Sequence, residues 1–288
     1  RLLGHEISSG GFVLDVNETP DPEEFEDAYM RYANARVCPP RPAEKTYRVR
    51  GTKEPFYTLN VIDGIMSVSA VQKVAKQYQA SITEYLNAVL LYSLLQKQEH
   101  DFHLRLRPVR IAMPVNLRRF FPSKTLRNFI TMVYPSIDPR LGDYTFEEIV
   151  TQVHHYMRYY INSKFLRGDI TTNASTQRNP LIRIVPLFLK DFVVRQFYQR
   201  VQDKNSSAGL TNMGAIRVPD DMKPYLERFD IYMGIPYSQR TNCAIVSFED
   251  TLTVNFASCI IEADVERRFF QKLVEDGIPV TIESNREL

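Results

Sequence analysis

The segment from Ser81 to Gln96 restricts the possible folds of this chain more than any other. Ser81 and Glu84 have the spacing of a capping box, in which the serine oxygen accepts from the amide three residues on and the glutamate reaches back. The helix that they open, from about Thr83 to Gln96, is apolar almost all the way round. Such a helix must be buried on several sides. It therefore predicts the centre of a folded core.

The sequence around this helix predicts an α/β domain. Amphipathic or capped patterns indicate further helices at 68–78, 145–165, 186–201 and 264–275. Alternating or apolar runs indicate strands at 46–50, 57–66, 107–113, 129–137, 208–213, 229–234, 243–248 and 252–258. This order of elements predicts a mixed, largely antiparallel sheet flanked by helices.

The first 45 residues show little periodicity and are predicted to be an arm or linker. A helix is expected to start at the acidic stretch 21–27 and to run to about Asn34. The prolines at 39, 40 and 42 then stop regular structure. The folded lobe is accordingly expected to span 46–288, with 1–45 outside it.

Composition excludes several classes of function. The net charge of +2, from 36 basic and 34 acidic residues, gives no bulk attraction to nucleic acid or to an anionic membrane. No apolar run approaches the roughly 18–20 residues that span a bilayer. The cysteines at 38, 243 and 259 lack the spacing of metal ligands and are typical of a reducing compartment, so a cytoplasmic protein without a metal is expected.

Histidine and arginine groups offer candidate chemistry that helix and surface positions also explain. His154 and His155 fall inside a helical pattern, where neighbouring side chains point about 100° apart. They are interpreted as ordinary helix residues. One predicted strand region carries three arginines, at 105, 107 and 110. They either lie on a solvated face or bind a phosphate-bearing cofactor, because guanidinium forks match phosphate oxygens.

Two polar segments stand at the ends of predicted strands, where loops usually carry function. Asn116 and Arg118 follow one strand, and Asn128 opens the next. Thr211 and Asn212 end a third strand just before a glycine. From spacing alone, these residues are either capping side chains of turns or members of a site.

Taken together, these segments resemble a known superfamily. Pro114-Val115-Asn116-Leu117-Arg118 followed by Asn128-Phe129 resembles the P-x-N-x-R … G-N-F stretch of the chloramphenicol-acetyltransferase-like superfamily, which includes condensation domains and alcohol O-acetyltransferase-like proteins. Leu210–Gly214 resembles its S-N-x-G strand end. Arg127 departs from the pattern, because the family often has glycine there.

The resemblance implies a C-terminal lobe of a CoA-dependent acyltransferase. The family's H-H-x-x-x-D-G motif, whose second histidine is the general base, is absent from this chain. It is expected on a separate N-terminal lobe, and the chain, which begins with Arg1, is expected to be part of something longer. The implied reaction is acyl transfer from acetyl-CoA or another acyl-CoA to an alcohol, in a tunnel between the lobes.

On this chain the resemblance places Thr211 and Asn212 in the tunnel near the oxyanion. Asn116, Arg118 and Asn128 are implied to be tunnel or loop-fixing residues. A lobe without its partner would expose an apolar face, so a homodimer is expected. The alternatives are a non-catalytic assembly module on the same scaffold, because fold does not imply retained chemistry, and an unrelated α/β binding domain.

Overall fold

The strands of the protein form one sheet of mixed direction. The computed structural model describes residues 19, 21–36, 44–55, 58–101, 105–178, 205–236 and 239–286. Within these ranges the strands are β1 (Asn60–Ser67), β2 (Val109–Asn116), β3 (Ile130–Val133), β4 (Ser136–Ile137), β5 (Ala208–Ala215), β6 (Thr241–Phe248), β7 (Thr251–Ser258) and β8 (Thr281–Ser284).

The strand order is β3-β2-β5-β6-β7-β1-β8, with β4 also paired to β2. Both parallel pairings of the described strands involve β5, with β2 on one side and β6 on the other, and the remaining pairings are antiparallel. The prediction of a mixed, largely antiparallel sheet is confirmed.

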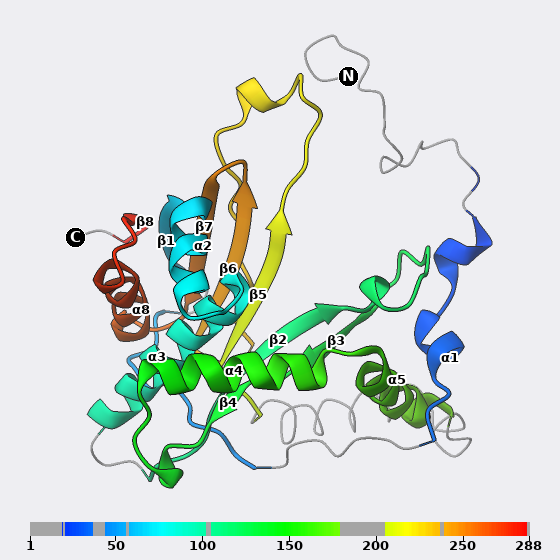
Figure 1. Ribbon diagram of the computed structural model, residues 1–288, viewed down its shortest axis with the longest axis horizontal. Coiled ribbons are helices and arrows are strands. Elements are labelled where there is room, and N and C mark those ends of the chain that lie inside the picture. The colour runs from blue at the N-terminus through cyan, green and yellow to red at the C-terminus, as the bar shows by residue number, and fades with distance from the viewer. Residues whose placement is uncertain are drawn as a thin grey trace.

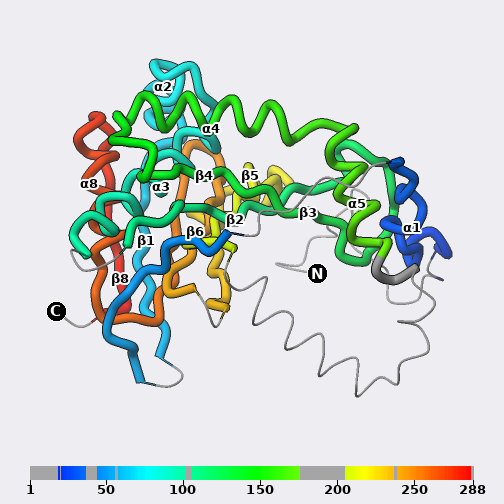
Figure 2. Tube along the Cα trace, turned by 90° about the horizontal axis from the view of Figure 1, so that it is seen from below, coloured from blue at the N-terminus to red at the C-terminus, as the bar shows by residue number. Residues whose placement is uncertain are grey.

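The α-helices of the described residues are α1 (Ala28–Tyr32), α2 (Val68–Gln77), α3 (Ile82–His100), α4 (Phe146–Tyr160), α5 (Ser163–Arg178) and α8 (Asp264–Glu275), and a short 3-10 turn η1 lies at Pro22–Phe25. Three of them surround α3, which is the element that the sequence placed at the centre. α3 packs against α2, α4, α8 and strand β2, and Figures 1 and 2 show it between α4 and the strands. The expected helix at 186–201 lies outside the described residues.

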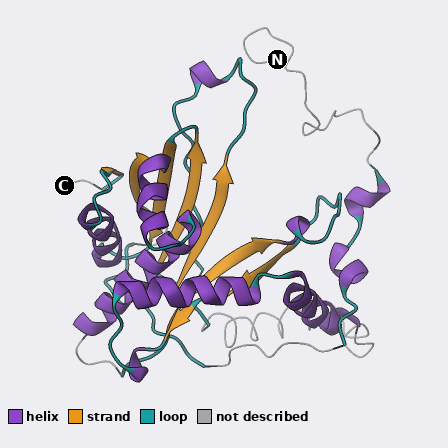
Figure 3. Ribbon diagram, viewed as in Figure 1, coloured by secondary structure: helices purple, strands orange, loops and turns teal. Residues whose placement is uncertain are grey.

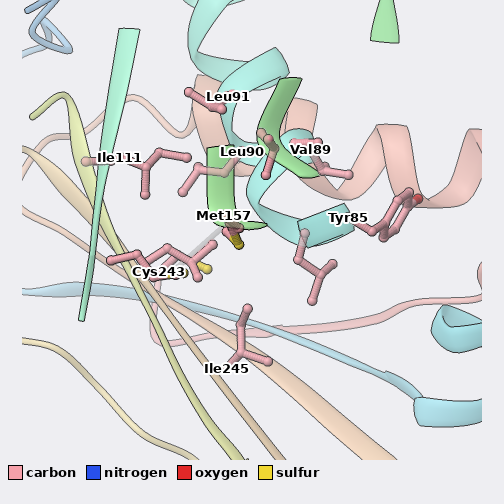
Figure 4. Packing of buried hydrophobic residues seen from close by; sticks show 14 of the residues in the cluster. Tyr85, Val89, Leu90, Leu91, Ile111, Met157, Cys243 and Ile245 are labelled. Atoms are coloured by element: carbon pink, nitrogen blue, oxygen red, sulfur yellow. The ribbon is translucent and has the colours of Figure 1, made fainter. Parts of the chain in front are cut away.

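The capping box of α3 forms as the sequence predicts. Ser81 Oγ accepts from the Glu84 amide at 3.3 Å, and Glu84 Oε2 accepts from the Ser81 amide at 2.7 Å. Behind this cap the helix is buried on all sides, with Leu90 and Leu91 fully inaccessible. Figure 4 shows its side chains against Ile111 and Cys243 of the sheet and Met157 of α4. The helix is therefore the centre of the core.

Strands β2 and β5 are paired at only two positions, which are the first two residues of β5 and the third and fourth of β2. Their pairing consists of Ile111 with Ala208 and Ala112 with Gly209. Beyond this point the two strands diverge, β5 continuing with β6 and β7 while β2 and β3 run away from them (Figures 1 and 3). The polar ends of β2 and β5 therefore stand on two separated arms of the sheet.

The described part of the first 45 residues packs against β3 and α5. Tyr29 of α1 lies edge-on to the buried Phe129, with ring centroids 5.2 Å apart, and its hydroxyl accepts from the Ile130 amide at 3.1 Å. Thr125 Oγ1 donates to the Glu26 carbonyl at 2.6 Å. Residues 21–36 thus pack against the arm of the sheet that β2 and β3 form. The proline stretch lies outside the described residues.

The structure corrects two of the predicted strands. Residues 46–50 are extended but form no strand, and Tyr47 donates its amide to the Pro108 carbonyl at 2.9 Å. Residues 229–234 also form no strand. Side chains of the sheet hold their backbone instead: Thr253 donates to the Phe229 carbonyl and Asn255 Oδ1 accepts from the Ile231 amide. This segment crosses the face of the sheet instead of extending its edge.

The single helix predicted at 145–165 is two helices. α4 ends at Tyr160, and Asn162 Oδ1 accepts from the amides of Lys164 and Phe165, both at 3.0 Å. An asparagine in this position caps a new helix, so α5 starts here. β8 was not predicted, because its four residues are exposed and carry no apolar pattern.

Removing a side chain from the centre of α3 should weaken the whole fold. We expect Leu90→Ala to lower the free energy of unfolding by about 2–5 kcal/mol, since a fully buried leucine leaves a cavity. Leu141→Ala, at a leucine that is 79% exposed, is the matched control and should change it by less than about 0.5 kcal/mol. Chemical denaturation of both variants measures the difference, and equal effects would contradict a core centred on α3.

A buried carboxyl group on α8 makes stability depend on pH. Glu266 is 2% exposed and accepts from Thr241 Oγ1 at 2.6 Å. Burial raises the pKa of Glu266 above its ordinary value of 4.5. The folded state therefore holds this proton to higher pH than the unfolded state does. The resulting stabilisation is present below the unfolded pKa and is lost as pH rises through the folded pKa.

We therefore expect Glu266→Gln to flatten the fall in unfolding free energy that the parent protein shows as pH rises above about 4.5. Glu275→Gln, at an exposed position of the same helix, should leave the slope unchanged. Urea unfolding at a series of pH values measures both. A slope that is identical in the parent and in Glu266→Gln would show that this proton is not retained on folding.

Candidate functional site

The first turn of α3 meets the outer part of β5 through a pair of polar side chains. Asn212 Nδ2 donates to Thr83 Oγ1 at 2.8 Å, and Asn212 Oδ1 accepts from the Gly214 amide at 2.8 Å. Gly214 has a φ of 77°, a conformation that suits glycine and lets its amide turn back to Asn212. Both ends of the Asn212 amide are thus held, and the side chain fixes the position of Thr83.

Asn87, one turn further along α3, adds a buried polar group. Its side chain is fully inaccessible, and Nδ2 donates to the Thr83 carbonyl at 2.9 Å and lies 3.5 Å from Met113 Sδ. Its Oδ1 is buried and accepts no hydrogen bond among the described residues. A buried acceptor without a donor is costly, of the order of 1–3 kcal/mol, and calls for an explanation in a native fold.

Glu84 and His154 form a second polar contact at the same end of α3. The residues of both contacts are together called the polar cluster: Thr83, Glu84, Asn87, His154 and Asn212. His154 Nδ1 lies 3.3 Å from Glu84 Oε1. The sequence predicted His154 and His155 to be ordinary helix residues, and they do lie on α4. Only a contact between two helices brings His154 to the cap of α3, and sequence spacing does not reveal such a contact.

The sequence identified Asn212 but missed its neighbours in the polar cluster. One signal was present: Asn87 interrupts an otherwise apolar helix at a position that should be buried. A polar residue at such a position needs a partner. Thr83 and Glu84 had been assigned to the capping box alone.

Thr211 lies beside Asn212 in the chain but not on the same face. Successive side chains of a strand point to opposite faces, and Leu210 and Asn212 share the helix-covered face. Thr211, opposite Ala244 of β6, projects from the other face. Its hydroxyl makes no hydrogen bond among the described residues. The structure therefore does not bring Thr211 into the polar cluster.

Asn116 and Arg118 organise the loop between β2 and β3. Asn116 Oδ1 accepts from the Arg118 amide at 3.1 Å, capping a short 3-10 turn at Leu117–Arg119. The Arg118 guanidinium donates to the carbonyls of Thr125 and Arg127 at 2.6 and 2.7 Å. Asn128 is exposed and makes no side-chain hydrogen bond within the described chain. These residues stand on the arm that diverges from β5.

The Thr83 hydroxyl of the polar cluster can donate a hydrogen bond to a developing negative charge. Thr83 Oγ1 accepts a hydrogen bond from Asn212, so the hydroxyl proton of Thr83 points away from Asn212. Among the described residues this proton is donated to no acceptor. Thr83 lies in the first turn of α3, where the helix dipole favours negative charge. A preorganised donor of this kind is what an oxyanion requires.

The described residues contain no cluster of metal ligands. No three histidine, cysteine, aspartate or glutamate side chains come together there as metal ligands. Cys243 is buried in the core, where desolvation raises the pKa of its thiol, and Cys38 lies outside the described residues. No described helix has the length and hydrophobicity to cross a membrane.

Comparison with known proteins identifies the fold. No protein-family model and no curated protein sequence matches the chain. Among solved structures, the trichothecene 15-O-acetyltransferase TRI3 of Fusarium sporotrichioides is similar over 80% of this chain and 49% of its own, with a TM-score of 0.55 and 15% identity. The nonribosomal peptide synthetase FmoA3 is similar over 82% of this chain and 23% of its own, with a TM-score of 0.51 and 11% identity.

This chain thus spans about half the length of the acetyltransferase that it resembles. Identities this low establish architecture and leave chemistry to be argued from residues. The strand order, the central buried helix and these similarities together identify a chloramphenicol-acetyltransferase-like fold.

Proposed function

We propose that this chain is the C-terminal lobe of a CoA-dependent acyltransferase that transfers an acyl group from acyl-CoA to an alcohol. The observation that carries the proposal is the Thr83 hydroxyl, held by Asn212 at the positive end of α3. The similarity in fold to an O-acetyltransferase supports it. The general base of the H-H-x-x-x-D-G motif is proposed to lie on an N-terminal lobe.

In the proposed reaction the alcohol oxygen attacks the thioester carbonyl carbon, and its proton passes to the histidine of the other lobe. The carbonyl oxygen becomes an oxyanion, which accepts a hydrogen bond from Thr83. When the tetrahedral intermediate collapses, the carbon–sulfur bond breaks and the CoA thiolate takes the proton back from the base. The products are an ester and free CoA.

The remaining site residues are proposed to shape the tunnel. Asn212 is a positioning residue, because it acts on Thr83 through its amide. Thr211 is proposed to line the tunnel from the other face of β5. Arg118 and Asn116 keep the β2–β3 loop in one conformation through three hydrogen bonds to its backbone. Asn128 is proposed to face the tunnel at the exposed edge of that loop.

The hydroxyl of Thr83 is tested in the protein as its gene encodes it, with all lobes present. We expect Thr83→Val to lower kcat about 10²–10³-fold with a much smaller change in KM, since loss of one oxyanion donor affects the transition state. Thr83→Ser, which keeps the hydroxyl, should restore most of kcat. Asn212→Ala should lower kcat about tenfold or more through loss of positioning.

Asn34→Ala is the matched control, because Asn34 is exposed and lies two residues after the end of α1. This variant should leave kcat unchanged. The readout is release of CoA thiol from acetyl-CoA with an alcohol acceptor. Equal activity of Thr83→Val and the parent would remove Thr83 from the mechanism. If the gene product lacks the H-H-x-x-x-D-G motif and shows no turnover, the non-catalytic assembly module becomes the better account.

The isolated chain is expected to associate with itself. Met213 on β5 is 57% exposed, and Leu126 and Met132 are exposed on the diverging arm. Large apolar side chains that stay exposed on two neighbouring arms of a sheet are typical of surfaces that contact a partner. We expect a two-fold dimer in sedimentation velocity, weakened in Met213→Lys. A stable monomer at micromolar concentration would overturn this expectation and the proposed homodimer with it.

A further inference from the structure

A cavity of about 370 Å³ lies at the C-terminal end of α3, and arginines dominate its lining. Tyr47, Val49 and Gly51 supply the other walls. We call it the arginine pocket, and its basic residues are Arg48, Arg50, Arg105, Arg107 and Arg240. They come from three separate stretches of the chain. Arg110, which the sequence grouped with Arg105 and Arg107, is buried elsewhere and donates to the Asn205 carbonyl at 3.2 Å.

The backbone under the arginine pocket is held in place from several sides. Gln98 of α3 accepts from the Arg107 amide at 2.9 Å and donates to the Arg107 carbonyl at 3.0 Å. The Tyr47 hydroxyl donates to Asp101 Oδ2 at 2.8 Å. Tyr47 and Val49 are buried in the core, so the alternating side chains of Arg48 and Arg50 point outward. The guanidinium groups therefore project from a fixed frame.

Carboxylates of the described residues do not neutralise four of these five arginines. Among the described residues, no carboxylate lies within ion-pair distance of Arg50, Arg105, Arg107 or Arg240. Asp101 is paired with Lys97 at 3.3 Å, and Glu262 accepts from the amide and the hydroxyl of Thr52 at 2.7 and 2.8 Å. The four like charges of Arg50, Arg105, Arg107 and Arg240 around one cavity repel one another unless an anion lies between them.

We propose that the arginine pocket binds a small molecule that carries two or more phosphate groups. Guanidinium forks pair with phosphate oxygens in two parallel hydrogen bonds, and a phosphomonoester brings a charge of about −1.5 to −2, so two such groups balance most of the cluster. The volume is that of a small-molecule site. A compact cavity in a chain of net charge +2 favours a small ligand over a nucleic-acid strand.

The arginine pocket is distinct from the polar cluster. Gln98 and Asp101 connect the pocket to the last turn of α3, whereas Thr83 and Glu84 lie in its first turn. α3 has 19 residues and is therefore about 28 Å long. The proposed ligand site thus stands independently of the proposed acyl transfer.

Isothermal titration of the chain at a fixed ionic strength of about 0.15 M, where distant surface charges are screened, tests the proposal, with inorganic pyrophosphate and adenosine 3′,5′-bisphosphate as probes. The first carries adjacent phosphates and the second separated ones, so their relative affinities report the spacing that the pocket recognises. We expect saturable binding of at least one probe, accompanied by a rise in Tm. The double variant Arg50→Gln/Arg107→Gln should raise the Kd about tenfold or more.

The matched control is Arg36→Gln/Arg217→Gln, which makes the same change in net charge at two exposed arginines outside the pocket. Its Kd should stay within about twofold of the parent value, because bulk charge is screened by salt. Circular dichroism and thermal unfolding without ligand show that both double variants remain folded.

Three results would overturn the proposal. The first is the absence of saturable binding of either probe at millimolar concentration. The second is an equal loss of affinity in the pocket and control variants. The third is tighter binding of a single-stranded oligonucleotide than of both probes, lost in the pocket variant, which would assign the arginines to a nucleic-acid surface. Acyl-transfer assays play no part in these readouts, so failure here leaves the proposed function untouched.

Discussion

Burial of α3 on every side is the constraint on which the rest of the structure depends. An apolar helix without a polar face can be stable in water only if other elements cover all of it, and here α2, α4, α8 and the sheet do so. Polar chemistry is thereby excluded from the middle of the helix and displaced to its two ends. The polar cluster lies at the first turn, and the arginine pocket lies beyond the last.

The elements best predicted from the sequence were those whose own periodicity determines their burial. α3 and α8 were found because their apolar residues alone demand a helix, and the predicted range 264–275 matches α8. Residues 46–50 and 229–234 also alternate, yet they form no strands, because alternation requires one covered face and does not specify a pairing partner. Only the contacts of Thr253 and Asn255 reveal that 229–234 crosses the sheet.

The site was less predictable because it is made by contacts between distant residues. Asn212 meets Thr83 across 129 positions, and His154 meets Glu84 between two helices. Residues that are adjacent in the sequence were wrongly expected to lie in one place. Thr211 and Asn212 were predicted to share a site, but neighbouring side chains of a strand point to opposite faces. The predicted group of Arg105, Arg107 and Arg110 also changes in the structure. Arg110 is directed inward, and the arginine pocket instead combines Arg105 and Arg107 with three further arginines at 48, 50 and 240.

The divergence of β2 and β5 explains why polar residues at both strand ends do not meet on this chain. Two residue pairs hold the strands together near α3. Beyond them β2 and β5 diverge (Figure 1), so that Asn116 at the end of β2 and Asn212 on β5 lie on separate arms. Each arm carries exposed apolar residues beside its polar ones, Met213 on β5 and Met132 on β3. Neither arm covers the other, so an occupant that contacts both must come from outside the described residues. The second lobe that we propose satisfies that requirement, and in the proposed reaction Thr83 stabilises the oxyanion formed from the substrate that the two lobes enclose.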